Sequence, residues 1–404
     1  MVSRRFLSSI LVSTFFLQLG IWVRNIAILL YVVEHTGGNG FAVSMISVAE
    51  FLPIFIFSFI GGTFADRWNP KKTMVWSDIL SSISILFILL ALSFGSWKAI
   101  FFATIVSSIM SQFSQPSAMK LFKQNVREEL MQSSMSLFQT LLAIFMVLGP
   151  ILGTIVYQQF GIHISIGIMC ISFLLSAIAL TFIPSDGIRK GSMNTQVWQE
   201  MKAGLNYVLS KRLLTLLGIS FLISGLGVGL VVPMGIFIVT ERLNLPESYY
   251  QWIATSKGIG MILGGVLSVM ASKRVAPLYL LTTGFLVNAA CLATAGFSTF
   301  FWLTFSAEFL IGFVTPAFQV AIQTLILKNT DEAYIGRVNG MLTPLFMGAM
   351  VLTMSFSGWL KDMLSVTVMY ELAAVFFLIS TLITKSMYRV LPRKSTVGLT
   401  DTLS

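Results

Sequence analysis

Apolar runs long enough to cross a bilayer follow one another along almost the whole chain, and they constrain its fold more than any other feature. In hydrocarbon every backbone N–H and C=O must be satisfied internally, so a run of about 20 apolar residues predicts a transmembrane α-helix. Of the 404 residues, 56% are hydrophobic and only 10% are charged, whereas soluble domains carry about 25% charged residues. The sequence predicts an all-α membrane protein with twelve transmembrane helices, over residues 8–33, 41–64, 73–94, 98–118, 130–157, 162–183, 212–240, 249–271, 277–296, 299–327, 337–360 and 364–387.

The distribution of basic residues predicts the orientation of these helices. If both termini are cytoplasmic, the inner segments hold 21 of the 26 Lys and Arg residues, and the outer loops hold only Lys98, Arg242 and Lys361. Short cytoplasmic loops are enriched in Lys and Arg, so we expect this topology in a bacterial cell membrane. Because the bases are scattered over short turns, we expect membrane lipids as neighbours and no nucleic-acid partner.

The longest inner segment divides the predicted helices into six and six. We expect an N-terminal half over 1–183, a cytoplasmic linker over 184–211, a C-terminal half over 212–388 and a cytoplasmic tail over 389–404. Two features recur at nearly the same offset, as pseudo-repeats would produce: Pro116 with Pro316, and Gly61-Gly62 with Gly264-Gly265. The fold class is therefore two six-helix pseudo-repeats.

The linker contains a predicted amphipathic helix. Its apolar residues recur at helical spacing, and basic residues accompany them, as expected for a helix on an anionic inner leaflet. The apolar residues are Trp198, Met201, Leu205 and Val208.

A short charged hairpin, Gly61–Lys72, joins the second and third predicted helices. Asn69-Pro70 prevents the helix from continuing, and Asn69 is suited to a left-handed turn. A carboxylate on such a loop, Asp66, can either contact the amino end of another helix or remain a solvated turn residue.

The hairpin resembles the signature of the major facilitator superfamily, Gly-x-Leu-Ala-Asp-Arg-x-Gly-Arg-Lys. Five residues match it, and Phe64, Asn69 and Pro70 depart from it. The matching residues are Gly62, Ala65, Asp66, Arg67 and Lys71. The resemblance implies a cytoplasmic gate in which Asp66 meets the start of the eleventh helix, with Gly62, Asp66, Arg67, Lys71 and Arg337 as its residues.

Within the superfamily the chain looks most like the macrolide-efflux branch of bacterial drug exporters. The segments Gln115–Ala118, Tyr334–Val338 and Gly149–Gly153 carry that likeness. The last resembles the antiporter motif, which implies that Gly149, Pro150 and Gly153 bend the fifth helix. Thr154 and Ser107 depart from the pattern, Ser107 standing where many relatives carry an intramembrane arginine.

Four charged residues, Arg24, Glu50, Lys257 and Glu308, fall deep inside the predicted spans, away from their ends. A charge at this depth is costly, so Glu50 and Glu308 are candidate proton carriers, with Arg24 as a candidate counter-charge. Either acid could instead be structural, and which acid pairs with Arg24 and which with Lys257 is left open. Lys257 could also extend to the membrane surface.

Polar residues on the fourth and tenth helices form stripes that either line a pathway or pack against a neighbouring helix. The candidate cavity-lining residues are Ser108, Gln112, Gln115, Thr304, Thr315, Gln319 and Lys257. Two further acids, Asp78 and Glu371, lie near helix ends, where we expect interfacial or structural roles.

These features predict a secondary transporter and not an enzyme. No phosphate-binding loop is present, and Cys170 and Cys291 lie in apolar runs, so we expect no metal or organic cofactor and a proton gradient as the energy source. The resemblance implies proton-coupled export of a small amphipathic substrate by a monomer. Export of a siderophore or peptide, flipping of a lysolipid or glycolipid, and a non-transporting receptor or scaffold are the alternatives.

Overall fold

The computed structural model describes residues 4–183, 197–271, 275–331 and 334–390, without the side chains of residues 4, 58–67, 103, 128, 197–201 and 269–271. Every regular element in these ranges is helical: α1 (Arg4–Thr36), α2 (Gly40–Arg67), α3 (Pro70–Ser93), α4 (Ala99–Asn125), α5 (Glu128–Thr181), α6 (Val197–Ser210), α7 (Arg212–Val231), α8 (Gly235–Phe237), α9 (Tyr250–Ala271), α10 (Pro277–Phe297), α11 (Phe301–Asn329), α12 (Ile335–Met363) and α13 (Val366–Met387).

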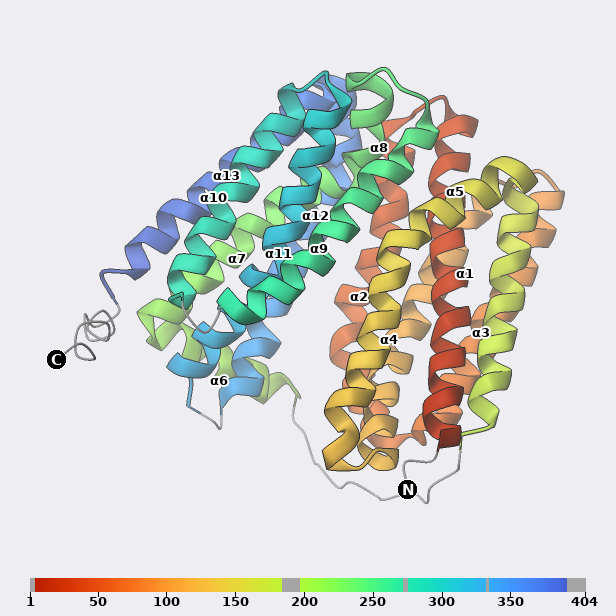
Figure 1. The fold of residues 1–404 in the computed structure, drawn as a ribbon, viewed down its shortest axis with the longest axis horizontal. Helices are drawn as coiled ribbons and strands as arrows, with labels where there is room; N and C mark the ends of the chain where they lie inside the picture. Colours follow the sequence, from red (N-terminus) through yellow and green to blue (C-terminus); the bar gives the residue numbers. More distant parts are fainter. Residues whose placement is uncertain (1–3, 184–196, 272–274, 332–333, 391–404) are drawn as a thin grey trace.

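The helices form two bundles side by side, α1–α5 in one and α7–α13 in the other (Figure 1). The bundles meet along two helix pairs, α2 with α12 and α5 with α9. We call the end of the molecule that carries the turn at residues 37–39 the upper end. The opposite, lower end carries α6 and the first residues of α1 (Figure 1).

The twelve predicted spans all correspond to helix. Nine helical segments in the described ranges are long and apolar enough to cross a membrane. One of them, Glu129–Thr181, has 53 residues and is interrupted at Gly161 (φ 73°, ψ −176°), so it supplies two spans. The other two spans are α4 and α9, which have 27 and 22 residues and pack within the same bundles. The prediction of a twelve-helix membrane protein is confirmed.

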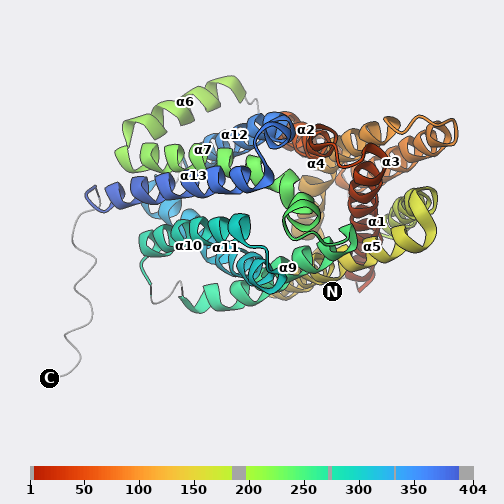
Figure 2. The ribbon, with the colours of Figure 1, turned by 90° about the horizontal axis from the view of Figure 1, so that it is seen from above.

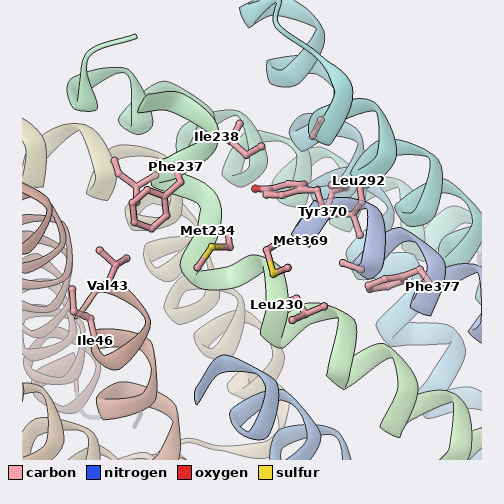
Figure 3. Packing of buried hydrophobic residues seen from close by; sticks show 14 of the residues in the cluster. Val43, Ile46, Leu230, Met234, Phe237, Ile238, Leu292, Met369, Tyr370 and Phe377 are labelled. Atoms are coloured by element: carbon pink, nitrogen blue, oxygen red, sulfur yellow. The ribbon is translucent and has the colours of Figure 1, made fainter. Parts of the chain in front are cut away.

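The seventh predicted span is less regular than the sequence suggests. After α7 the chain passes through a 3-10 turn (Val232–Met234), α8 and a π-helical turn (Ile238–Arg242). Pro233 stands in the 3-10 turn, where its missing N–H interrupts the α-helical hydrogen bonds. Beyond the break, Phe237 lies toward Val43 and Ile46 of α2 (Figure 3), so this irregular segment belongs to the packing between the halves.

The hairpin between α2 and α3 corrects one local expectation. Asn69 has φ −69° and ψ 116°, an extended and not a left-handed conformation, and its side chain accepts a hydrogen bond from the Lys72 amide at 3.1 Å. Asn69 is therefore the N-cap of α3, and Pro70 follows in the first turn, where a missing N–H costs nothing.

The predicted linker helix exists as α6, and it packs on α12 and α7 at the edge of the C-terminal bundle (Figure 2). Val208 is buried, and Gly204 lies against the backbone of Arg337. Leu205 is exposed, while the side chains of Trp198 and Met201 lie outside the described residues. The helix is thus docked on protein along one side, and contact with lipid stays a prediction.

Glycines bring the two halves together toward the upper end. A Cβ on Gly358 of α12 would lie 2.0 Å from the carbonyl oxygen of Gly40 on α2, and one on Gly258 of α9 would lie 2.5 Å from that of Met146 on α5. The hydroxyls of Ser44 and Ser357 are 3.0 Å apart in the same seam. Only glycine permits backbones to approach this closely.

The lower end of α12 differs. Among the described residues, a Cβ on Gly336 or Gly340 would have no atom outside the local helix within 4 Å, and the two bundles diverge in this direction (Figure 1). At the other end of the same helix, Lys361 is buried at 8% exposure and pairs with Glu241 at 2.6 Å. Lys361 thus lies in the last turn of α12, which continues to Met363, and not in the loop after it, while its placement on the outer side stays a prediction.

Candidate functional site

The N-terminal half holds a buried base and an acid joined by an amide. Arg24 on α1 is 3% exposed, and its Nε donates to Asn25 Oδ1 at 2.8 Å. Asn25 Nδ2 donates in turn to Glu50 Oε1 on α2 at 3.3 Å. Arg24 Nη1 is buried without a hydrogen-bond partner among the described residues. Arg24 and Glu50 are thus brought together, and Asn25, which sequence reasoning missed, connects them.

The C-terminal half holds a direct ion pair. Lys257 Nζ on α9 lies 3.4 Å from Glu308 Oε2 on α11, where the side chain of Glu308 is 8% exposed and that of Lys257 is 46% exposed. The alternative in which Lys257 extends to the membrane surface is therefore wrong. The pairing that the sequence left open is Lys257 with Glu308 and Arg24 with Glu50.

Lys257 and Glu308 line a cavity of about 370 Å³ between the two halves. Its wall is mostly apolar and aromatic, with Asn288, Tyr250 and Tyr370 adding polar atoms. Figure 3 shows Leu292, Tyr370 and Phe377 of this wall close to one another. The N-terminal half contributes Trp22, Ile26 and Met146. An apolar cavity of this volume with few polar groups is typical of a small-molecule site.

Some polar residues of the stripe on α11 pack inside the bundle, and others are exposed. Gly312 lies against the backbone of Lys257, where an added Cβ would be 2.1 Å from the carbonyl oxygen. Thr304 is fully buried with no hydrogen-bond partner for its hydroxyl among the described residues, and Thr315 bonds the Ile311 carbonyl oxygen at 2.7 Å. Gln319 is exposed. Of the α11 stripe, only Glu308 is among the residues that line the central cavity.

The stripe on α4 is likewise outside the central cavity. Ser108 is buried, and Gln112 donates to the Ser111 hydroxyl at 3.0 Å. Gln115 lines a second cavity, inside the N-terminal half. The same cavity contains Asp78, which is 4% exposed, so of the two roles expected for Asp78 the interfacial one is wrong and the structural one stays a prediction.

Comparisons with known proteins identify the family. The family model described as Major Facilitator Superfamily matches residues 10–233 and again residues 217–401. The chain belongs to the major facilitator superfamily. It is 25% identical over 353 residues to the uncharacterized MFS-type transporter YkuC of Bacillus subtilis, covering 83% of this chain and 81% of that protein.

One further relative and one solved structure are also similar to this chain. Macrolide efflux protein A of Streptococcus pyogenes is 21% identical over 355 residues, covering 85% of this chain and 86% of that protein. The crystal structure of the nucleoside transporter NupG superposes with a TM-score of 0.73 at 12% identity, covering 95% of this chain and 99% of that chain. The structural likeness supports the fold alone, and the family makes this chain a multi-pass membrane transporter.

The antiporter-like motif of this superfamily member lies where α5 packs on α1. A Cβ on Gly149 would be 2.4 Å from the Trp22 ring, and one on Gly153 would be 2.7 Å from Ile26 Cβ. The helix continues through Pro150, and the residue with non-helical torsions is Gly161. The glycines therefore allow close packing within the N-terminal half, and the role of the motif as a helix bend stays a prediction.

The proposed gate is described only in part. The side chains of Asp66 and Arg67, and the surroundings of Gly62, lie outside the described part of the structure. Lys71 Nζ donates to the carbonyl oxygens of Thr181 and Ile183 at 2.7 and 2.5 Å, so it caps the end of α5 within its own half. Arg337 lies 5.1 Å from the centre of the Tyr334 ring. The contact of Asp66 with the start of α12 stays a prediction.

Proposed function

We propose that this superfamily member exports small hydrophobic or amphipathic compounds in exchange for protons. One observation supports this more than any other: a mostly apolar cavity between the halves holds a single acid–base pair, Lys257 with Glu308. Apolar walls suit an amphipathic substrate, and a carboxyl at this depth can take and release a proton.

The charge pair supplies the coupling in this proposal. While Glu308 is ionised it holds Lys257, and when it is protonated the ammonium group loses its counter-charge. Lys257 can then reorient toward the cavity that its exposed surface already faces. In this proposal the substrate and the proton both act on the Lys257–Glu308 pair, so binding of either one lowers the affinity of the transporter for the other.

Alternating access follows from the seam between the halves. We place the lower end in the cytoplasm, as the distribution of Lys and Arg predicts. The glycine contacts of α2 with α12 and of α5 with α9 then close the outer side. Breaking them and closing the lower end would turn the cavity outward, and Asp66 is the candidate residue for that second contact.

Transport in inverted vesicles tests this proposal. Vesicles containing the protein and an imposed inward-acid pH gradient should accumulate a macrolide or an amphipathic dye, and a protonophore should abolish the accumulation. Vesicles from cells with the empty vector are the control. Accumulation of peptides or lysolipids alone, or uptake that ignores the gradient, would contradict the proposal.

A further inference from the structure

The N-terminal half contains a cavity of its own, separate from the one between the halves. It has a volume of about 440 Å³ and lies among α1, α3, α4 and α5. Its inner wall is buried, with Ile10 and Phe173 at 0% and 2% exposure, whereas Gln115 and Met119 are exposed. The cavity thus runs from an exposed mouth on α4 to a closed floor at α3.

Asp78 of α3 is the only charged residue among those that line this cavity. Its Oδ2 accepts a hydrogen bond from Ser176 Oγ at 2.6 Å. Ser176 and Ser13 are 2.9 Å apart, and since the Ser176 proton is directed to Asp78, Ser13 donates to Ser176. No Lys, Arg or His nitrogen in the described part of the chain lies within 4.0 Å of Asp78.

A carboxylate that is 4% exposed, and to which the described residues offer one hydroxyl donor and no counter-charge, is expensive to maintain. The two acids of the sites described above both have basic neighbours, whereas the described part of the chain offers Asp78 a single hydrogen-bond donor, the Ser176 hydroxyl. A bound cation would supply the missing charge.

The rest of the cavity selects the kind of cation. Buried hydroxyls of Ser81, Ser107 and Ser114 line one part, and apolar or aromatic side chains such as Met74 and Phe138 line another. The volume greatly exceeds that of a metal ion, which requires several oxygens converging at about 2–3 Å. A mixed wall of this size fits an organic molecule with one charged end.

We propose that this cavity binds a small organic cation, with its ammonium group against Asp78 and its apolar body against Phe138, Met74 and Phe173. The binding proposal depends on this cavity alone. That the bound cation is afterwards exported rests on the proposed function.

Equilibrium dialysis of the purified full-length protein in detergent with radiolabelled benzyltrimethylammonium tests the proposal. We expect saturable binding, and a loss of affinity of about tenfold or more in Asp78→Asn, because a charge-assisted contact is replaced by a neutral one. The acid variant Glu371→Gln, on α13 and outside this cavity, should bind like the wild type. Neopentylbenzene, the uncharged isostere, should not displace the label.

A second variant separates loss of binding from loss of folding. Ser111→Phe narrows the cavity while leaving Asp78 in place, so it should weaken binding in a protein with an unchanged size-exclusion profile. Equal binding by wild type and Asp78→Asn, or no saturable binding by the wild type, would overturn the proposal. Asp78-dependent binding of sodium without the organic cation would overturn it in favour of a metal-ion site. Because dialysis involves no transport, these results are independent of the vesicle experiment.

Discussion

Each half of this transporter places a base beside an acid in the membrane, but the two halves do so differently. In the C-terminal half Lys257 and Glu308 are in direct contact at 3.4 Å and line the central cavity. In the N-terminal half Arg24 reaches Glu50 only through Asn25, and these residues are not among those lining that cavity.

The difference lies in access to the central cavity. Lys257 has 46% of its side chain exposed, so its partner can exchange a proton with the cavity, whereas Arg24 is 3% exposed. A sealed guanidinium held by a neutral amide has little freedom to release its partner, and it is better suited to fixing α1 against α2. We therefore expect coupling to depend mainly on Glu308, and the position of the N-terminal helices to depend on Arg24, Asn25 and Glu50.

The largest effect is expected for Glu308→Gln. Removing the carboxylate eliminates proton binding and leaves Lys257 without its counter-charge, so gradient-driven uptake in inverted vesicles should fall to the empty-vector level. Glu50→Gln should reduce the rate of uptake and leave the pH dependence of uptake unchanged. If Glu308→Gln transported with an intact pH dependence while Glu50→Gln did not, the assignment of coupling to the C-terminal half would be reversed.

The charge-neutral double variant Lys257→Met with Glu308→Gln is the matched control. It leaves no unpaired charge at the cavity, so protein yield should recover relative to Glu308→Gln alone. Uptake should remain independent of the pH gradient, because the carboxyl is still absent.

The sequence predicts the spans and the presence of charged residues within them because both depend on local features, but it leaves the pairing of those charges open. A run of about 20 apolar residues must be helical wherever it packs, and Arg24, Glu50, Lys257 and Glu308 are conspicuous within such runs. Asn25 is a neutral residue next to a charge, and its bridging role becomes visible only when α2 is placed beside α1.

Features that depend on a distant partner could not be predicted. The closeness of Gly358 to Gly40 requires two residues from opposite ends of the chain to meet. The burial of Asp78 depends on α5, whose Ser176 reaches it from 98 residues away. The expectation for Asn69 is wrong for a different reason, since the same side chain suits both a left-handed turn and an N-cap, and the following proline favours the cap.

Gly358→Leu tests whether the glycine contacts between the halves hold the upper end closed. An added side chain meets the Gly40 backbone, which costs about 1–3 kcal/mol in the closed seam, or a population shift of about fivefold to 150-fold toward the upper-open state. The readout is the disulfide yield of the Ser44→Cys and Ser357→Cys pair, whose hydroxyls are 3.0 Å apart, in a background lacking Cys170 and Cys291.

Gly340→Leu is the control for this shift, because it places the same side chain on the same helix at a position where an added Cβ has no described neighbour within 4 Å. It should leave the disulfide yield unchanged. Equal yields for Gly358→Leu and the parent protein would contradict the closed glycine seam.

Asn25→Ala tests the structural role assigned to the N-terminal half. Loss of the bridging amide leaves buried polar atoms of Arg24 and Glu50 without partners, so the free energy of unfolding should fall by about 1–3 kcal/mol in detergent. Combined with Glu50→Gln, the two changes should be non-additive, because they remove the same network. Asn288→Ala should be additive with Glu50→Gln, because the one hydrogen bond of its side chain to the described residues goes to the Gly284 carbonyl oxygen on its own helix. Additivity in both combinations would show that Asn25 does not connect the two charges.

The smallest effect is expected for a change of pH at the upper end, where acids of the two halves approach each other. Glu34 of α1 and Glu247, on the turn before α9, both line a cavity of about 990 Å³. Desolvation, and then the charge of Glu34, raise the pKa of Glu247 above its usual value. Opening the seam would separate the two acids and return that pKa toward its usual value, so protonation favours the closed upper end. The stabilisation is therefore gained as the pH on the upper face falls through the raised pKa of Glu247, and it is lost above it.

The disulfide yield of the Ser44→Cys and Ser357→Cys pair should consequently rise as the upper face is acidified. The expected change is less than about fivefold, because a partly exposed pair of charges contributes about 1 kcal/mol or less. Glu247→Gln should give the acid-side yield at every pH, and comparing the two proteins at the same pH removes the pH dependence of thiol oxidation itself. A parallel pH response in both proteins would mean that the acids of the two halves do not act on each other across the seam.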